Sequence, residues 1–471
     1  MNRLDLLVVG AGPAGMAAAI MARRHGLEVL VIDDQPAPGG QIWRSVETAA
    51  RRDGVLGPAY AEGRAIVETF RASGAGYQPG AQLWRIEPGF RACLSIKRQA
   101  QVIEAATVIF ATGAQERPVP FPGWTLPGVL TVGAAQILLK NAGQIPARPV
   151  WIAGSGPLPL LYAQQLLKAG GQIAGYLDTT PGGRWIAALP HLPRALRAWR
   201  DLAKGLEWSA ALRRSKTPII QGVAEIAALG AERLEGLRYS TQGGVAATVE
   251  ADTLLVHEGV APSLHAALSL DCEVEWRSAQ DCYAPVVDRW GETSQPDLFI
   301  AGDGAGIAGA KAALLRGELA ALRIAVKLGR MNAGTAAAAA RPIRRRLDRE
   351  LAARPFLDAM FRPRPQVFAP ADETIVCRCE EVAAGEIRAL AAIGQPGPNQ
   401  IKAASRAGMG PCQGRQCGYT VTRILSAEQN RPPAEVGFFH VRPPLKPVTL
   451  GELASLDRLA SPLTRDGPFE S

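Results

Sequence analysis

Four of the seven cysteines stand close together near the C-terminal end of the sequence. Cys377 and Cys379 are separated by one residue, and Cys412 and Cys417 follow in a glycine-rich stretch with four residues between them. Four thiolates can hold a zinc ion or an iron–sulfur cluster. Because structural zinc sites usually place two residues between paired cysteines, these gaps favour a [2Fe–2S] cluster over zinc or free thiols. The remaining cysteines stand apart and are expected to be structural: Cys93, Cys272 and Cys282.

The N-terminal stretch carries the pattern of a dinucleotide site. An apolar run at residues 6–9 predicts a strand, the glycines Gly10, Gly12 and Gly15 predict a turn, and an alanine-rich helix follows. A second strand ends at Asp33. The first glycine allows a tight turn, the second lets the backbone approach a pyrophosphate, and the third lets helix and strand pack closely. The phosphates would lie on free N–H groups at the start of the helix, with Asp33 accepting from a ribose hydroxyl.

Three later segments add small residues to this site. The turn-rich loop 36–44 carries adjacent glycines that let the backbone approach a ligand. One strand ends near residue 113 and another near residue 302, each in a run of small residues, and a helix at 309–328 follows the second. Asp303 at the head of that helix can accept from sugar-alcohol hydroxyls, and the alternative is that it caps the helix.

Residues 150–178 repeat the plan of residues 6–33, with a strand, a glycine turn, a helix and a second strand. Gly154 and Gly156 are present, but Pro159 stands where the third glycine would be. A proline is compatible with the first turn of a helix, so we expect the fold to be retained. Two alternatives remain for this turn: a bound NAD(P) or other nucleotide, and an idle site.

Candidate catalytic side chains are few. His257 and Glu258 are adjacent on a predicted strand, where neighbours point to opposite faces, so we expect structural roles for both. No Cys-x-x-Cys pair lies near a nucleotide motif, as a disulfide reductase would require, and no hydrolase or zinc-protease motif is present. No residue is therefore assigned a catalytic role.

Composition places the chain among globular proteins of two or three domains. It has 471 residues, 47% of them hydrophobic and 20% charged, and a net charge of +9. The densest basic run, Arg344-Arg345-Arg346, is interpreted as a solvated helix face or a protein-docking surface and not as a nucleic-acid site. Residues 1–9 lead directly into a strand and no apolar run is long enough to span a bilayer, so we expect a cytoplasmic protein.

The elements predict an α/β fold with two dinucleotide-binding domains and a small α-rich C-terminal domain. An alanine tract, an arginine cluster and several prolines indicate a connector with one helix at roughly 341–361. The expected boundaries are 1–147 for the first part of the N-terminal nucleotide-binding domain, 148–260 for the second nucleotide-binding-like domain, 261–330 for the second part of the first domain, 331–371 for the connector, 372–430 for the cysteine domain and 431–471 for a C-terminal docking tail.

These motifs resemble known families. The fingerprint, the loop Pro38-Gly39-Gly40-Gln41-Ile42 and the later strand ends are similar to flavoproteins of the glutathione and thioredoxin reductase type. Residues 371–430 resemble the [2Fe–2S] domain of bacterioferritin-associated ferredoxin, with two additional residues in the second cysteine pair. With the closing segment 441–447, the combination resembles the large subunit of heteromeric amine dehydrogenases, which include opine oxidases, D-hydroxyproline and proline dehydrogenases, and bacterial hydrogen cyanide synthase.

The resemblance implies FAD as the dinucleotide and a [2Fe–2S] cluster on Cys377, Cys379, Cys412 and Cys417. It also implies a smaller FAD-dependent subunit that oxidises the amine. It leaves open an FMN at the subunit interface, a small ferredoxin-like third subunit, and contact with the respiratory chain at the inner membrane face. The residues implied for FAD are Gly10, Gly12, Pro13, Ala14, Gly15, Asp33, Asp34, Gly40, Gln41, Ala111, Thr112, Gly113, Gly302 and Asp303.

We hypothesise that this chain moves electrons from a two-electron donor to a one-electron carrier during oxidation of a secondary amine or imino acid, such as an opine, D-hydroxyproline, proline or glycine. The first alternative is a stand-alone NAD(P)H-dependent reductase that uses residues 150–178. The second is a non-catalytic scaffold or cluster-based redox sensor whose basic connector contacts nucleic acid. The pocket that selects the amine is expected to lie in another chain.

Overall fold

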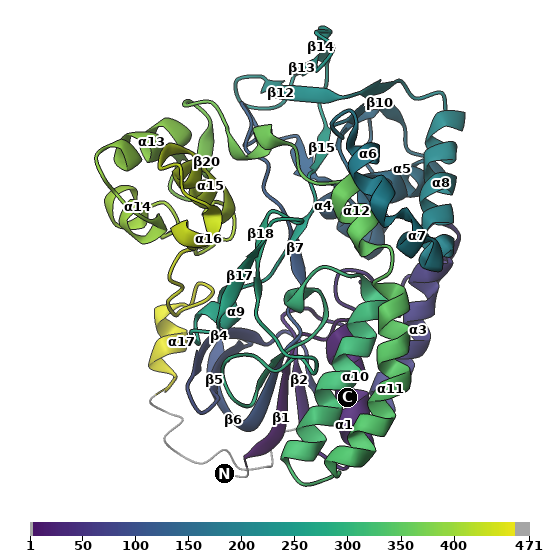
Figure 1. Cartoon of the computed structure of the whole chain (residues 1–471), viewed down its shortest axis with the longest axis vertical. Coiled ribbons are helices and arrows are strands. Elements are labelled where there is room, and N and C mark those ends of the chain that lie inside the picture. Colours follow the sequence, from purple (N-terminus) through teal and green to yellow (C-terminus); the bar gives the residue numbers. More distant parts are fainter. Residues whose placement is uncertain (1–2, 457–471) are drawn as a thin grey trace.

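Two sheets, one mixed and one parallel, each built around one of the glycine turns, form the frame of the molecule (Figure 1). The computed structural model describes residues 3–456, and the last part of the expected tail, 457–471, lies outside the described residues. A small domain of short helices lies to one side of both sheets, at the upper left of Figure 1. The predicted α/β architecture is therefore confirmed.

The first sheet carries the N-terminal fingerprint. Its strands run in the order β3-β2-β1-β6-β5-β4, and β19 also pairs with β6. The pairings among β3, β2, β1, β6 and β19 are parallel, whereas β4 and β5 return antiparallel. The bounds are β1 (Leu4–Val9), β2 (Val29–Ile32), β3 (Gly76–Gln78), β4 (Gln82–Glu87), β5 (Arg91–Ile96), β6 (Gln99–Phe110) and β19 (Leu298–Ile300).

Small residues let two helices pack closely on this sheet. Helix α1 (Pro13–Arg24) is rich in alanine and glycine, and α10 (Ala310–Lys327) lies directly against it (Figure 1). A Cβ atom added at Gly317 would lie 2.1 Å from Ala14 O, so only glycine permits this approach. The contact fixes the segment after β19 over the N-terminal fingerprint. Helices α2 (Asp53–Leu56) and α3 (Pro58–Arg71) also belong to this domain.

The second sheet is entirely parallel, in the order β11-β10-β9-β15-β8. The second domain therefore begins before residue 148, the boundary expected from the sequence, because β8 pairs with β15 in this sheet. Its strands are β8 (Val129–Thr131), β9 (Val150–Gly154), β10 (Ile173–Asp178), β11 (Ile219–Gln221) and β15 (Leu254–His257). Its helices are α4 (Val132–Ala142), α5 (Pro157–Lys168), α6 (Arg184–Ala188), α7 (Leu192–Ala195) and α8 (Trp199–Arg214).

Smaller antiparallel units join the two sheets. Three strands form a separate antiparallel sheet at the edge of the second domain, and two pairs of strands bridge the domains. The bounds are β12 (Val223–Leu229), β13 (Gly236–Thr241), β14 (Ala246–Glu250), β7 (Ala114–Glu116) with β16 (Val260–Pro262), β17 (Val274–Arg277) with β18 (Cys282–Pro285), and α9 (His265–Leu268).

The expectation of one helix at roughly 341–361 is wrong. The segment instead forms two helices, α11 (Ala333–Glu350) and α12 (Arg354–Met360). Alanine is the strongest helix former, so the alanine tract belongs inside α11. The helix tolerates Pro342 because its apolar side packs with α10 on a buried cluster around Trp290.

The arginine run lies on this helix. The Arg344 guanidinium lies 4.2 Å from the centre of the Trp290 ring, which is a cation–π contact. Arg345 and Arg346 are exposed, as the sequence interpretation expected.

The cysteine domain has its own small core. It consists of β20 (Ile375–Cys377), β21 (Val382–Ala383), α13 (Ala384–Ala392), α14 (Pro398–Ser405) and α15 (Gly418–Glu428), followed by α16 (Pro433–Val436). Val436 and Phe439 belong to the same buried cluster as Val376 and Ile424, so the start of the expected tail packs into this domain. Helix α17 (Leu450–Ala454) ends the described chain beside β6.

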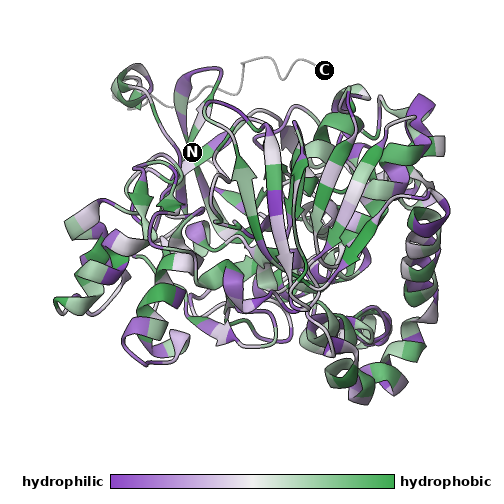
Figure 2. Ribbon diagram, turned by 90° about the horizontal axis from the view of Figure 1, so that it is seen from above, coloured by the Kyte–Doolittle hydropathy of each residue, from purple (hydrophilic) through white to green (hydrophobic). Residues whose placement is uncertain are grey.

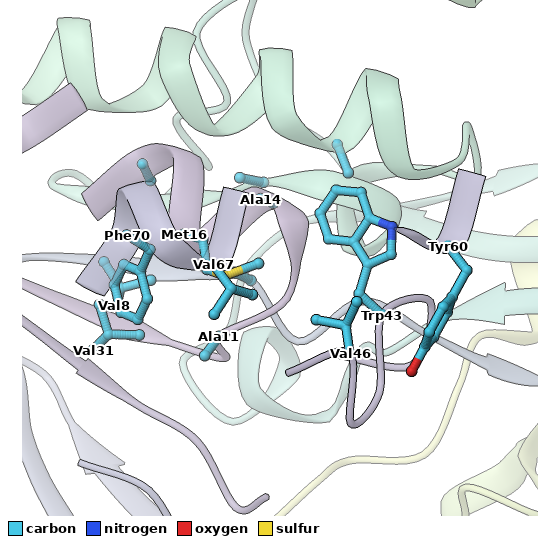
Figure 3. Packing of buried hydrophobic residues seen from close by; sticks show 14 of the residues in the cluster. Val8, Ala11, Ala14, Met16, Val31, Trp43, Val46, Tyr60, Val67 and Phe70 are labelled. Atoms are coloured by element: carbon cyan, nitrogen blue, oxygen red, sulfur yellow. The ribbon is translucent and has the colours of Figure 1, made fainter. Parts of the chain in front are cut away.

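The main core lies under the first glycine turn. In the view from above, hydrophobic residues concentrate on the central strands (Figure 2). Figure 3 shows Val8, Ala11 and Met16 gathered near Val31, with Trp43 and Tyr60 a short way along the same cluster. Because strands of a parallel sheet are covered on both faces, nearly continuous apolar sequence is expected in them. Within residues 3–456, no helix is both long and apolar enough to cross a bilayer.

Candidate functional site

The first glycine turn has the shape that a dinucleotide requires. Gly10 has φ +108°, and a Cβ there would lie 2.5 Å from Ala111 O. A Cβ at Gly15 would lie 1.9 Å from Gly10 O, so this position closes the contact between helix and strand. At Gly12, by contrast, an added Cβ would meet only Gly40 Cα, at 3.8 Å. The second glycine therefore faces open space, and no side chain caps the start of α1.

Asp33 closes the turn at the end of β2. Its Oδ2 accepts from Ala11 N at 2.5 Å and its Oδ1 accepts from Gln35 N at 2.7 Å. The side chain is buried, and burial raises the pKa of this carboxyl, while the two backbone hydrogen bonds lower it. The carboxylate is thus held beside the turn with acceptor capacity left for a hydroxyl. Its neighbour Asp34 is directed elsewhere, because it pairs with Lys446 from the C-terminal tail.

The structure brings the later predicted segments to this turn. A Cβ at Gly302 would lie 2.9 Å from Ala14 Cβ, and a Cβ at Gly304 would lie 3.5 Å from Gly113 O. Gly40 lies against Gly12 from the other side. These segments are far apart in the sequence, so their convergence on one helix start supports a shared ligand. The residues present fit a dinucleotide such as FAD, because small residues and Pro13 stand where its phosphates would approach the start of the helix.

Asp303 holds the loop between β19 and α10 in place. Its Oδ1 accepts from Ala308 N at 2.8 Å and from Gly309 N at 2.9 Å, just before α10. This arrangement is close to the capping role that was the alternative for this residue. Because Oδ1 alone makes both bonds, Oδ2 remains available to a ligand. Arg316 donates to Gly302 O at 2.9 Å and fixes the same turn from inside α10.

A side chain of the connector lies beside the second glycine turn. Gly156 corresponds in position to Gly12, but a Cβ there would meet Phe361 Cβ at 3.9 Å and Phe361 Cγ at 4.0 Å. Phe361 follows α12, which packs on α6 and α7. In open α/β sheets, ligands bind outside the carboxyl ends of the strands, and this is where the connector lies. The fold is retained at residues 150–178, as predicted.

Buried contacts hold the connector in this place. Arg364 Nε donates to Glu258 Oε1 at 2.8 Å, and the two side chains are only 4% and 2% exposed. Arg362 pairs with Asp281 at 2.6 Å. Phe368 packs in the core cluster of the second sheet. Glu258 therefore has the structural role that we expected.

His257 is also structural. Its Nδ1 lies 2.7 Å from Glu116 Oε1, and Glu116 Oε2 accepts from Gly133 N at 2.9 Å. His257 is buried at the end of β15 and the pair links β7 to the start of α4.

All four clustered cysteines lie in the small domain and none forms a disulfide. The thiol of Cys417 hydrogen-bonds to Cys377 and lowers the Cys377 pKa to about 6. Backbone N–H groups of Gly408, Glu380 and Cys379 also stabilise the Cys377 thiolate. Burial raises the pKa of Cys379, and Cys412 is its nearest thiol partner.

A glycine lets the two pairs approach each other. A Cβ at Gly410 would lie 2.3 Å from Cys379 Cβ, so the glycine-rich loop passes directly over the first pair. Within residues 3–456, however, no group of three or more His, Cys, Asp or Glu side chains stands ready to hold a metal ion. The four-cysteine ligand set therefore stays a prediction. The gathering of four thiols and the N–H groups around Cys377 fit an iron–sulfur cluster.

The cysteine loop, residues 407–417, packs on the first domain. It lies beside the residues around the first glycine turn, Gly10, Gly12, Gly15, Gly40 and Gly302, which we call the nucleotide cradle. Gln115 Nε2 donates to Arg415 O at 2.9 Å, two residues beyond the strand end at Gly113. His265 Nε2 lies 2.8 Å from Gln413 O, and burial lowers the His265 pKa to about 3, so the neutral ring donates this bond. Arg415 also donates to Leu445 O at 3.0 Å. The two candidate sites thus lie on adjoining surfaces.

Several of these residues could not be found from the sequence. Gln115, His265 and Phe361 are isolated in the chain and belong to no motif. Lys140 was also missed: it is a buried amine whose Nζ donates to Gln41 O at 2.9 Å. The one available signal was a lysine within an otherwise apolar helix stretch, Ile137–Leu139.

The fold and the site together define a two-domain, FAD-dependent oxidoreductase. Residues 4–329 match the family model described as pyridine nucleotide-disulphide oxidoreductase, and residues 372–456 match the sarcosine oxidase A3 domain. The thioredoxin reductase of T. acidophilum has the same fold, with a TM-score of 0.51 over 70% of this chain and 99% of that one, at 17% identity.

Two kinds of relative extend over the whole chain. An opine oxidase subunit of Rhizobium meliloti is 42% identical over 469 residues, covering 98% of this chain and 89% of that protein. The hydrogen cyanide synthase subunit HcnB of Pseudomonas protegens is 31% identical, covering 97% and 99%. L-proline dehydrogenase from P. horikoshii has a similar fold, with a TM-score of 0.70 over 96% of this chain and 79% of that one, at 19% identity. The chain belongs to the family of this opine oxidase subunit and HcnB, within the pyridine nucleotide-disulphide oxidoreductases.

Proposed function

We propose that this chain is the electron-transferring subunit of a heteromeric dehydrogenase that oxidises a secondary amine or imino acid of the opine, D-hydroxyproline, proline or glycine type. Its partner is a smaller FAD-dependent subunit in which the CH–NH bond is oxidised. The support is the nature of its relatives, which are subunits of opine oxidase and of hydrogen cyanide synthase and are themselves parts of larger enzymes.

The observation that carries the proposal is the docking of the cysteine loop beside the nucleotide cradle. Gln115 connects the strand end at Gly113 to Arg415, which lies between Cys412 and Cys417. Binding a nucleotide alone, or a structural metal alone, does not require the two sites to be adjacent. A chain that passes electrons from one centre to another requires the centres on adjoining surfaces.

The residues of this chain hold and orient the two groups. Gly12 and Gly40 leave room for the pyrophosphate of FAD, while Asp33 accepts from the ribose. The four clustered cysteines hold a [2Fe–2S] cluster, with backbone N–H groups on Cys377 stabilising the negative sulfur. When bound, FAD supplies two-electron chemistry and the cluster one-electron transfer.

The alternative of a stand-alone NAD(P)H reductase is less well supported. Phe361 covers the second glycine turn at Gly156, and the Arg364–Glu258 pair holds the connector there. A nicotinamide dinucleotide would need this same space for its pyrophosphate. We therefore propose that residues 150–178 keep the fold without using the nucleotide.

The decisive experiment is anaerobic reduction of the purified chain, alone and with its partner subunit. We expect the flavin to be bleached by an opine or cyclic imino acid only when the partner is present, and not by NADH or NADPH. Extraction of the flavin separates FAD in this chain from FMN at the interface. Bleaching of the isolated chain by NAD(P)H would favour the alternative.

A cysteine variant tests the cluster. Cys379→Ser removes one predicted ligand on the exposed side, so we expect loss of iron and of the electron paramagnetic resonance signal after dithionite, with FAD retained. Cys93→Ala is the matched control, because Cys93 is buried in β5 away from the cysteine domain. Iron that survives Cys379→Ser, or zinc in the wild-type protein, would contradict the [2Fe–2S] assignment.

A further inference from the structure

Lys140 is a buried cation that crosses from one domain to the other. It stands in the last turn of α4, a helix of the second domain, and its side chain is only 4% exposed. Its Nζ donates to Gln41 O at 2.9 Å and to Gln136 Oε1 at 2.9 Å. Gln41 follows Gly40, whose backbone lies against Gly12 in the nucleotide cradle. The ammonium group therefore contacts, through Gln41 O, the loop that brings Gly40 to the cradle.

No carboxylate compensates this charge in the part of the chain that the structure describes. Burial, together with the nearby charge of Arg44, lowers the pKa of Lys140 to about 7. The Tyr60 ring lies 6.0 Å from Nζ, and Arg52 donates to Lys140 O. Neither group is an anion near neutral pH, since burial raises the pKa of Tyr60 to about 12. A buried ammonium without an anion is costly, so Lys140 loses its proton more readily than an exposed lysine, and negative charge placed nearby would favour its charged form.

A chain of hydrogen bonds fixes the ammonium in place. Gln136 Nε2 donates to Gln165 Oε1 at 2.9 Å, and Gln165 Nε2 donates to Leu56 O at 3.0 Å. Arg52 also donates to the backbone carbonyl of Asn141 at 3.1 Å. The bonds tie helices α4 and α5 of the second domain to residues 41–56 of the first. Because two acceptors and this buried network hold the amine, Nζ is fixed beside Gln41 O and away from solvent.

We propose that Lys140 is a built-in positive charge of the flavin site, which stabilises the negative charge that bound FAD gains on reduction and so raises its reduction potential. The inference rests on the proposed binding of FAD at the first glycine turn. Lys140 neither gives nor takes electrons. It supplies a charge in a region of low dielectric constant, where two charges several ångströms apart interact more strongly than they do in water.

The proposal also assigns a proton. When electrons arrive nearby, the ammonium form becomes more favourable, so a Lys140 side chain that was neutral takes up one proton from solvent. Tyr60 stays neutral because burial raises its pKa to about 12, so it does not supply this change. Two-electron reduction of FAD to an anion adds one proton to the flavin itself, so only the proton taken up beyond this one is linked to Lys140.

The test is the reduction potential of bound FAD in three proteins, measured by dye-coupled anaerobic titration. Lys140→Met keeps the length of the side chain and removes the charge, and Lys140→Arg keeps the charge. At about pH 6 and a given potential, we expect the ratio of reduced to oxidised FAD to be at least tenfold lower in Lys140→Met than in wild type. For a two-electron couple, a tenfold change equals a fall of about 30 mV in the reduction potential. The Arg variant is expected to match wild type at about pH 6 and to exceed it at about pH 9, because only lysine loses its proton.

The matched control is Lys168→Met, which removes an exposed charge from the neighbouring helix α5 and is expected to leave the potential unchanged. Proton uptake gives a second test: at about pH 8, the number of protons taken up per FAD reduced, followed with a pH indicator, should be larger in wild type than in Lys140→Met, because the flavin's own protons are common to both proteins. Equal potentials in wild type and Lys140→Met, with FAD bound to both, would overturn the inference and leave the proposed function intact. A wild-type chain that binds no FAD would overturn both.

Discussion

The change Gly12→Ala should separate folding from cofactor binding. Gly12 has φ −77° and ψ −175°, an extended conformation that alanine adopts without strain. The added methyl would meet only Gly40 Cα at 3.8 Å, which is an ordinary van der Waals contact. Alanine reduces the entropy of the unfolded chain, worth about 0.4–1 kcal/mol, but is a poorer helix N-cap than glycine by a similar amount. We therefore expect the stability of the FAD-free protein to change by less than about 1 kcal/mol.

Binding should respond differently, because the methyl fills the space that the pyrophosphate needs. A hydrogen bond from a backbone N–H to a charged phosphate contributes about 1.5–3 kcal/mol. Displacing the phosphate enough to lose one such bond weakens FAD binding by about 10–150-fold, since about 1.4 kcal/mol equals a factor of ten. The affinity is measured by titrating FAD-free protein and following flavin fluorescence, and the stability by urea unfolding without FAD.

Two neighbouring glycines provide controls. Gly54→Ala adds a methyl in helix α2, where nothing lies within 4 Å, so both FAD affinity and fold should be retained. Gly15→Ala would place its Cβ 1.9 Å from Gly10 O, so that variant should fail to fold. The reasoning would be refuted by a Gly12→Ala protein that binds FAD as tightly as wild type, or by one that is strongly destabilised without FAD.

Two further changes test the packing that positions the sites. Arg364→Met leaves Glu258 buried and unpaired, so we expect the free energy of unfolding, measured with urea, to fall by about 3–5 kcal/mol. The double variant with Glu258→Met should largely recover this stability. An unchanged free energy in the single variant would contradict the buried pair. Burial lowers the pKa of His265 to about 3, below the unfolded value of about 6.5, so its contribution to stability is complete above about pH 6.5 and is lost as the pH falls toward 3, by about 2 kcal/mol at about pH 5. His265→Gln should flatten this part of the pH profile of thermal unfolding, and an unchanged profile would argue against the bond to Gln413 O.

The motifs were predicted from the sequence because their chemistry depends on local spacing. Gly10 and Gly15 are required by contacts within one strand–turn–helix unit, so their spacing already identifies them. Asp33 could be placed in the same way at the end of the second strand. The connector was less predictable. The sequence predicted one helix at roughly 341–361, whereas the alanine tract extends α11 back to Ala333, with Ala336 and Ala340 buried in the cluster shared with α10, a neighbour that is set by tertiary packing.

The sequence by itself determined the α/β class and the first nucleotide turn, because each rests on residue types at short, regular intervals, and it predicted the four-cysteine set from residues that are close together in the chain. Only the tertiary structure decided which distant segments meet. It placed Phe361 over the second glycine turn, Gln115 against the cysteine loop and Lys140 behind Gln41. These contacts join residues far apart in the chain, and a single side chain without periodic neighbours leaves no pattern in the sequence from which its partner can be inferred.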